Sequence, residues 1–208
     1  MGFRAGVFAV EDLAGLVARA AELAELSVVA IDMPIGLPDQ GQREADWRAR
    51  KAVGPRWQSV FLTPTRAALA EDSYPAATRI NEGLGGGIST QAYALRPRIL
   101  ELDAYVHNPA VPVIEVHPEV SFAALAGEYL PYPKKCWAGM VLRRDLLTSA
   151  GITVADDLGP PGVQAAVNAV LDAAVAAWSA RRHTAGQTIC YPYPPQIFSD
   201  GHHAAIRA

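Results

Sequence analysis

The sequence predicts an α/β protein, in which short buried strands are separated by amphipathic helices. Two apolar runs, 28–31 and 111–116, have the length and the β-branched content of strands that are buried on both faces. Elsewhere, apolar residues recur every three or four positions, which is the period of a helix that buries one side. Half of the 208 residues are hydrophobic, so the chain can bury a substantial core, and we expect a single domain over 1–208.

The first half of the chain alternates between strand and helix patterns. Residues 3–10 are typical of a strand, and two acidic residues then begin a helix, where the helix dipole favours negative charge. The second strand ends at Asp32 and is followed by a turn rich in proline and glycine. The elements expected here are a strand over 3–10, a helix over 13–24, a strand over 28–31, a polar helix near 41–52, and a loop or edge strand over 59–65.

The second half repeats the strand pattern once and then becomes helical. The glycine cluster 83–87 is typical of a flexible loop. The alternative, a phosphate-binding loop, lacks the Gly-Lys-Ser/Thr ending of a P-loop. The other elements expected are a helix over 97–105, a buried strand within 111–119, one long helix from Val163 onward, and an irregular proline-rich tail over 191–195.

Asp32 is the first candidate functional residue, because ligands of open α/β sheets bind beyond the carboxyl ends of the strands. Its alternative role is to cap the following turn through its side chain. Glu115 and Glu119 lie at and just beyond the end of the second apolar run, with His117 between them. His117 could donate to a scissile group or position a carboxylate, or it could be purely structural.

Asp172 is a single charge on an otherwise apolar helix, so a metal ion or a basic side chain is expected near it. Arg181 or Arg182 could supply that partner. Together with Asp32 and Glu115, Asp172 would provide the hard oxygen ligands that bind Mg²⁺ or Mn²⁺, and such ions assist phosphodiester displacement.

Charge and composition exclude several classes of protein. The net charge of −3 gives no overall attraction for nucleic acid, so any contact must be local. No apolar stretch approaches membrane-spanning length and no secretory signal is visible, so we expect a cytoplasmic protein without a membrane anchor. One local segment is either a nucleic-acid contact or a solvated helix face; it contains Arg43, Trp47, Arg48, Arg50, Lys51, Arg56 and Trp57.

Six strings, in this order, resemble the successive motifs of domain-of-unknown-function family 429. They are Ala30-Ile31-Asp32-Met33-Pro34-Ile35-Gly36-Leu37-Pro38, Ser59-Val60-Phe61-Leu62-Thr63-Pro64, Ser89-Thr90-Gln91-Ala92, Glu115-Val116-His117-Pro118-Glu119-Val120-Ser121-Phe122, Lys134-Lys135 and Leu171-Asp172-Ala173. The resemblance implies an RNase H-like fold, a mixed sheet flanked by helices, and a nuclease with a carboxylate–metal site.

The chain departs from this pattern at its N-terminus. RNase H-like domains open with a strand that carries an aspartate beside a glycine-rich hairpin, and the sequence has no such segment before residue 3. We therefore expect an N-terminally shortened domain that lacks the first, central strand. The gap would leave exposed sheet edges, and these predict rearranged pairing or a homodimer.

The leading hypothesis is a divalent-metal-dependent nuclease. Asp32, Glu115 and Asp172 would bind Mg²⁺ or Mn²⁺, and Glu119 and His117 would complete the catalytic group. The phosphate contacts expected are Arg43, Lys135 and Arg144. Two alternatives remain: a non-catalytic RNase H-like binding module that has lost a metal ligand, and an ATPase that uses the glycine cluster.

Overall fold

The computed structural model describes residues 12–208, so the strand expected over 3–10 lies outside the described part of the chain. In chain order the elements are α1 (Leu13–Ala21), β1 (Val29–Ile31), α2 (Glu44–Ala52), the 3₁₀ helix η1 (Gly54–Ser59), α3 (Arg66–Ala70), α4 (Tyr74–Leu84), α5 (Thr90–Ala94), α6 (Arg96–Val106), β2 (Val113–Glu115), α7 (Pro118–Ala126), α8 (Trp137–Ser149), α9 (Pro160–Gln164), α10 (Val167–Thr184), β3 (Cys190–Ile197) and β4 (His203–Arg207).

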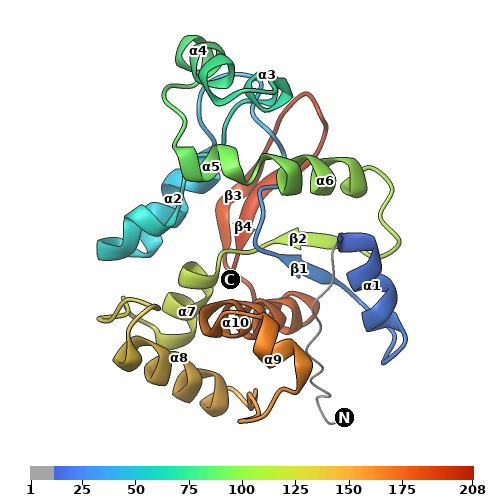
Figure 1. Ribbon diagram of the computed structural model, residues 1–208, viewed down its shortest axis with the longest axis vertical. Helices are drawn as coiled ribbons and strands as arrows, with labels where there is room; N and C mark the ends of the chain where they lie inside the picture. The colour runs from blue at the N-terminus through green and yellow to red at the C-terminus, as the bar shows by residue number, and fades with distance from the viewer. Residues whose placement is uncertain (1–11) are drawn as a thin grey trace.

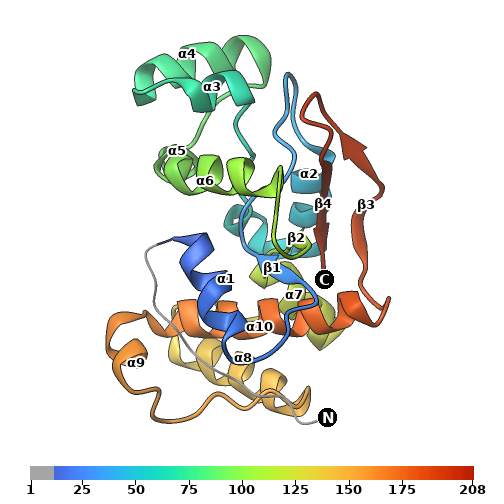
Figure 2. The same cartoon turned by 90° about the vertical axis from the view of Figure 1, so that its right-hand side faces the viewer.

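A four-stranded mixed sheet in the order β1-β2-β4-β3 forms the centre of the molecule (Figure 1). β1 and β2 are parallel, with Ile31 opposite Glu115, and β4 lies parallel to the other side of β2. β3 pairs antiparallel with β4 at the outer edge. Figures 1 and 2 both place α7, α8 and α10 below β1 and β2, and α3 to α6 above these two strands. The expected mixed α/β sheet flanked by helices is therefore confirmed.

The two faces of β1 and β2 bury alternate residues against different helices. Val28, Ala30, Ile114 and Val116 pack on α10 around Ala176. The intervening residues, Val29, Ile31 and Val113 among them, pack on α1 and α6. This alternation is the pleat of a strand covered on both sides, as the apolar runs predicted. β1 is only partly buried because it is the edge strand of the described sheet.

The helices follow the apolar periodicity of the sequence at most positions. α1 and α2 form within the segments expected, and α6 extends the expected helix by one residue at each end. Residues 60–65 form a loop that follows η1. Asp12 is the N-cap residue of α1, and its carboxylate accepts a hydrogen bond from the Gly15 amide at 2.6 Å. No described helix is long and apolar enough to span a membrane.

Two expectations for the C-terminal region need correction. The tail over 191–195 lies within β3, although its pairing with β4 is irregular between Tyr191 and Gln196. Prolines, which lack N–H groups, are tolerated there because β3 is an edge strand. The long helix expected from Val163 is divided into α9 and α10, because the backbone is extended at Ala165 and Ala166.

The glycine cluster ends α4 and does not begin a helix. The amides of Gly85 and Gly86 donate to the carbonyl of Asn81 in the last turn of α4. A Cβ atom on Gly85 would lie 2.5 Å from the carbonyl oxygen of Gly41, so only glycine allows these loops to touch. Phosphates bind at helix N-termini, where amides are free, and this arrangement does not support a phosphate loop.

A buried ion pair joins the ends of the central strands to α2. Arg43 Nη2 donates to Glu115 Oε2 at 2.6 Å, and the Ile35 amide donates to the same oxygen at 2.8 Å. Arg43 is fully buried, and its Nε also lies 3.7 Å from Asp46 Oδ1. Burial raises the pKa of Glu115 from its ordinary value of 4.5 to about 7, although the Arg43 charge acts to lower it.

We expect Arg43→Met to lower the free energy of unfolding by about 3–5 kcal/mol near pH 8, because it leaves a buried carboxylate unpaired. The raised pKa makes folded Glu115 bind a proton that the unfolded chain releases, so stability falls as pH rises from 4.5 to about 7. Without Arg43 the pKa is higher still and the loss continues above 7. Denaturant unfolding should therefore show a difference between wild type and variant that widens from about pH 7 to pH 9.

Arg48→Met is the matched control for Arg43→Met. Arg48 lies on α2 and pairs with Glu44 in solvent, so its replacement should cost at most about 1 kcal/mol. An Arg43→Met penalty that is no larger than this, or that is the same at all these pH values, would contradict the role given to the buried pair.

Candidate functional site

Asp32 and His117 lie side by side because β1 and β2 are parallel neighbours. Asp32 directly follows β1. One residue separates His117 from the end of β2, and His117 is the N-cap residue of α7. The His117 Nε2 atom lies 3.2 Å from the Ser59 carbonyl oxygen, which can only accept, so Nε2 carries the proton of the neutral ring. His117 Nδ1 is then an acceptor, and it is buried without a hydrogen-bond partner.

Asp172 reaches the same region from α10. It lies one turn before Ala176, the small residue that packs α10 against the sheet, so both are on the same face of the helix. Asp172 Oδ2 accepts from Lys134 Nζ at 2.6 Å, and Oδ1 is buried without a partner. A hydrogen bond of 2.8 Å between the buried hydroxyls of Ser179 and Ser121 joins α10 to α7 and so helps to fix Asp172 relative to His117.

The titratable groups that act on the Asp32 carboxylate are His117, Asp172 and Lys134. Asp32 is exposed at the surface, but atoms of the surrounding elements crowd its carboxylate, and this desolvation raises its pKa. A protonated His117 ring would act to lower the pKa, as the positive charge of Lys134 does, and the negative charge of Asp172 acts to raise it. Asp32, His117, Lys134 and Asp172 therefore form one interacting cluster, which we call the acid–base cluster.

A small pocket adjoins the acid–base cluster and is lined by Asp32, His117, Asp46, Phe61 and Thr63, among others. Its volume of about 20 Å³ is close to the space that one water molecule needs. A water or an ion fits there, but a nucleotide does not. A larger substrate would have to lie across the surface above the pocket.

Glu115 and Glu119 lie near the cluster in sequence but are held by arginines. Glu115 accepts from Arg43 and Ile35, as described above. Both oxygens of Glu119 accept from Arg143 Nη2, at 2.8 and 2.7 Å, and both side chains are buried. In the described residues no group of three histidine, cysteine, aspartate or glutamate side chains is arranged to hold a metal ion.

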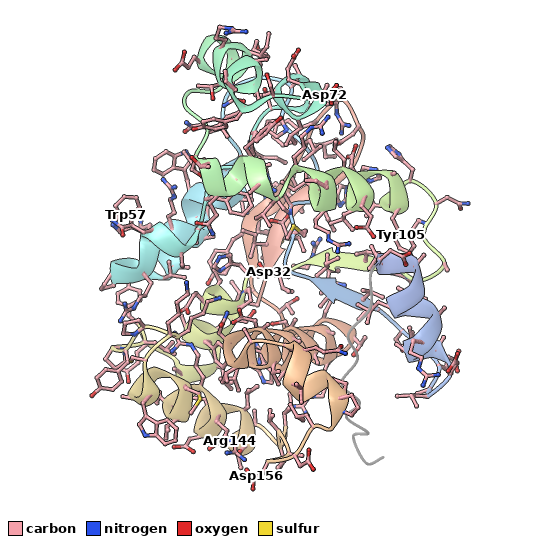
Figure 3. The ribbon with its side chains drawn as sticks, in the orientation of Figure 1. Asp32, Trp57, Asp72, Tyr105, Arg144 and Asp156 are labelled. Carbon is pink, nitrogen blue, oxygen red and sulfur yellow. The ribbon has the colours of Figure 1, made fainter. Side chains whose placement is uncertain are left out.

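The three basic residues expected to contact phosphate occupy different environments. Arg43 is buried in its ion pair and cannot reach a substrate. Arg144 lies on α8 and pairs with Asp156, well away from Asp32 (Figure 3). Lys135 is exposed; its neighbour Lys134 is the lysine that belongs to the acid–base cluster, through its hydrogen bond to Asp172. The pair Lys134-Lys135 was visible in the sequence, but not which of the two lysines reaches Asp172.

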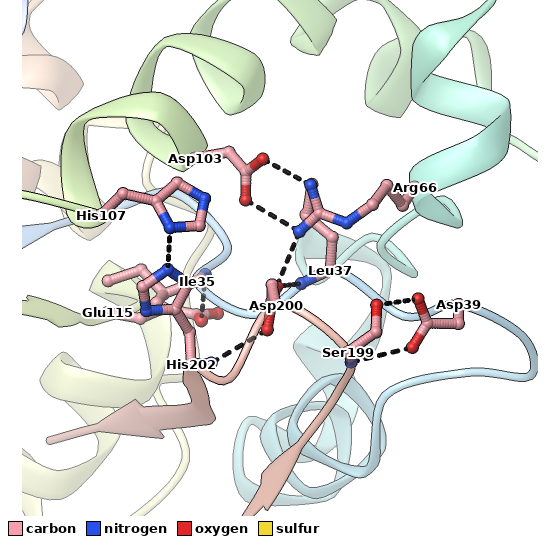
Figure 4. Close-up of polar contacts among 10 residues, drawn as sticks. All are labelled: Ile35, Leu37, Asp39, Arg66, Asp103, His107, Glu115, Ser199, Asp200 and His202. Atoms are coloured by element: carbon pink, nitrogen blue, oxygen red, sulfur yellow. Dashed lines mark hydrogen bonds and ion pairs between the residues drawn. The ribbon is translucent and has the colours of Figure 1, made fainter.

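A second polar network fastens the β3–β4 turn above the sheet (Figure 4). Asp200 accepts from Arg66 and from the Leu37 amide, at 2.7 and 2.9 Å. Arg66 also donates a hydrogen bond to Asp103 on α6. Nearby, His202 Nε2 lies 3.3 Å from His107 Nδ1. This network holds the segment after β1 against α6 and the hairpin, and it thereby fixes the backbone that follows Asp32.

The acid–base cluster predicts that only one of two adjacent lysines affects the pKa of Asp32. Lys134→Met should raise the pKa of Asp32 further, because it removes a positive charge that favours the carboxylate. Lys135→Met should leave it unchanged, because Lys135 does not act on Asp32 in the structure. A ¹³C NMR titration of the Asp32 carboxyl carbon measures both. Equal shifts in the two variants, or no shift with Lys134→Met, would show that the cluster is not formed as described.

Comparison with known proteins identifies one family. A family model described as "Protein of unknown function (DUF429)" matches residues 2–197, and no curated protein and no solved structure matches the chain. The match covers nearly the whole chain and includes all members of the acid–base cluster. The chain therefore belongs to the protein family DUF429.

Proposed function

We propose that this protein hydrolyses phosphodiester bonds in nucleic acid, with Mg²⁺ or Mn²⁺ bound between Asp32 and Asp172. One observation carries the proposal. Two carboxylates, a histidine and a lysine converge beyond the ends of two parallel strands, and two of their buried polar atoms lack partners. Such unpaired buried atoms are costly unless a ligand, ion or water satisfies them.

The chemistry of the two aspartates fits a magnesium site of the open kind. Mg²⁺ is commonly bound by one or two carboxylates, with water and substrate phosphate completing its shell. Asp172 Oδ1 is an unpartnered carboxylate oxygen, and the pocket beside Asp32 and His117 has room for one water molecule or one ion. Glu115 also lines the pocket, but its charge is paired with Arg43 and its Oε2 atom already accepts two hydrogen bonds, so we propose Asp32 and Asp172 without it. The bound ion would supply positive charge to the phosphoryl oxygens.

His117 is the proposed general base. Its Nε2–H donates to Ser59, which leaves the lone pair of Nδ1 available to take a proton from an attacking water. Lys134 neutralises Asp172 in the absence of substrate, and we propose that it contacts the phosphate when substrate binds. The exposed side chain of Lys135 is a second phosphate contact of this kind.

The finer structural expectations belong to the same proposal. Support for an RNase H-like fold comes from the parallel β1–β2 pair, from Asp32 at a strand end and from Asp172 on a late helix. The outer edge of β1 has no strand partner among the described residues, and we propose it as the contact in a homodimer. A cytoplasmic location agrees with a nucleic-acid substrate.

A second candidate function is a non-catalytic nucleic-acid-binding module. The observation that favours it is that arginine or lysine already neutralises Glu115, Glu119 and Asp172. Such a module would bind nucleic acid without cleaving it, so the experiment below separates the two functions.

The test is a cleavage assay on single-stranded, duplex and hybrid nucleic acids with Mg²⁺ or Mn²⁺. Asp32→Asn and Asp172→Asn should each reduce cleavage at least about 100-fold, because even indirect changes around a metal cost about 10–100-fold. His117→Gln should reduce it about 100-fold or more, as loss of a general base does.

Asp145→Asn is the matched control, since Asp145 is an exposed acid of α8 without an ion pair in the described structure. It should retain full activity. Absence of metal-dependent cleavage by the wild type, or equal cleavage by all four variants, would refute the nuclease proposal. Tight binding without any cleavage would favour the second candidate.

A further inference from the structure

Five of the six exposed aromatic side chains in residues 12–208 lie on two short segments. The first segment comprises α2 and η1, and the second, 129–137, leads into α8. We call this surface the aromatic flank; its members are Trp47, Trp57, Tyr129, Tyr132 and Trp137. Exposed aromatic groups of this number in one region are typical of a binding surface.

The two segments of the aromatic flank contact each other directly. Arg56 Nη2 donates to the Pro131 carbonyl oxygen at 2.7 Å. The ring of Tyr129 packs over Gly54 so closely that a Cβ atom there would lie 2.8 Å from it. Residues about 75 positions apart in the sequence are thus neighbours on one surface.

Arg50 holds the two tryptophans of the first segment in place. Its guanidinium carbon lies 5.3 Å from the ring centres of both Trp47 and Trp57. Its Nε atom also donates to the Val60 carbonyl oxygen at 2.8 Å. Because these contacts restrict the rings before any ligand binds, a ligand that stacks on them loses less entropy on binding.

The aromatic flank is also locally basic in a chain of net charge −3. In the described part of the chain, no carboxylate lies within ion-pair distance of Arg50, Lys51, Arg56 or Lys135. The acids of the two segments offset little of this charge. Asp46 is buried and Glu44 is paired with Arg48. Glu128, which directly precedes the second segment, is exposed and has no ion pair in the described structure.

The aromatic flank is continuous with the acid–base cluster at two points. Lys134 belongs to the second segment and bonds Asp172 at 2.6 Å. Ser59, the last residue of η1, accepts the hydrogen bond from His117. Figure 3 shows Trp57 at the outer side of the molecule and Asp32 near its centre.

We propose that the aromatic flank binds single-stranded nucleic acid and leads it to the acid–base cluster. Unpaired bases stack on flat side chains, and the neighbouring cations contact the phosphates. Duplex bases are stacked on one another and cannot reach the rings, so the surface selects single strands. An uncharged sugar or peptide would not require the unpaired cations. The link to cleavage rests on the proposed nuclease function, but the binding does not.

The test measures fluorescence anisotropy of labelled oligonucleotides of about 20 nucleotides with the full chain in EDTA, where no cleavage occurs. Trp57→Ala and Trp137→Ala should each weaken single-strand binding about tenfold. Tyr193→Ala is the control, because Tyr193 is 85% exposed on β3, outside the aromatic flank, and it should have no effect. Lys51→Ala combined with Lys135→Ala should reduce the salt slope by about two.

Three outcomes would overturn the proposal: no binding at about 50 mM salt, equal affinity for duplex and single strand, or equal effects of Tyr193→Ala and Trp57→Ala. Binding that salt weakens but that the tryptophan variants leave unchanged would also overturn it, because it would reflect charge alone. Single-strand binding that depends on the flank, in a chain without cleavage activity, would support this inference and refute only the nuclease proposal.

Discussion

The buried pair between Arg43 and Glu115 is the interaction on which the rest of the structure depends. A fully buried guanidinium is tolerated only when its hydrogen-bond partners are in place. The hydrogen-bond partners of Arg43 are Glu115, which ends β2, and Thr63 in the loop after η1. The Asp46 carboxylate of α2 lies 3.7 Å from Arg43 Nε and adds a negative charge without a hydrogen bond. The turn after β1 joins them through the Ile35 amide. All four segments must therefore be in position together, and their assembly fixes the strand ends that carry Asp32 and His117.

The sequence predicts local structure where apolar periodicity is the dominant signal. β1, β2, α1, α2 and α6 follow that signal, because each buries a defined face. β3 does not, since its prolines suggest an irregular tail and only its edge position next to β4 permits a strand. Nothing in the local sequence indicates the break between α9 and α10 at Ala165.

The candidate site was predictable in part. Asp32, His117 and Asp172 were recognisable as polar residues attached to apolar elements, and the structure brings them together. Glu115 and Glu119 gave the same signal, but each is neutralised by an arginine 72 or 24 positions away. A local pattern identifies a carboxylate that needs a positive partner. It does not distinguish a metal ion from an arginine that only the tertiary fold supplies.

The carboxylates paired with arginine and those not paired with arginine have different proposed roles. The acids held by arginine fix the framework, whereas Asp32 and Asp172 retain solvent contact or an unpartnered oxygen. The direct test is a Mn²⁺ titration followed by electron paramagnetic resonance of the unbound ion. The account predicts one bound Mn²⁺ per chain, with affinity weakened at least about tenfold by Asp32→Asn or Asp172→Asn and unchanged by Asp145→Asn. Failure of the wild type to bind Mn²⁺, or the same affinity in all the variants, would contradict it.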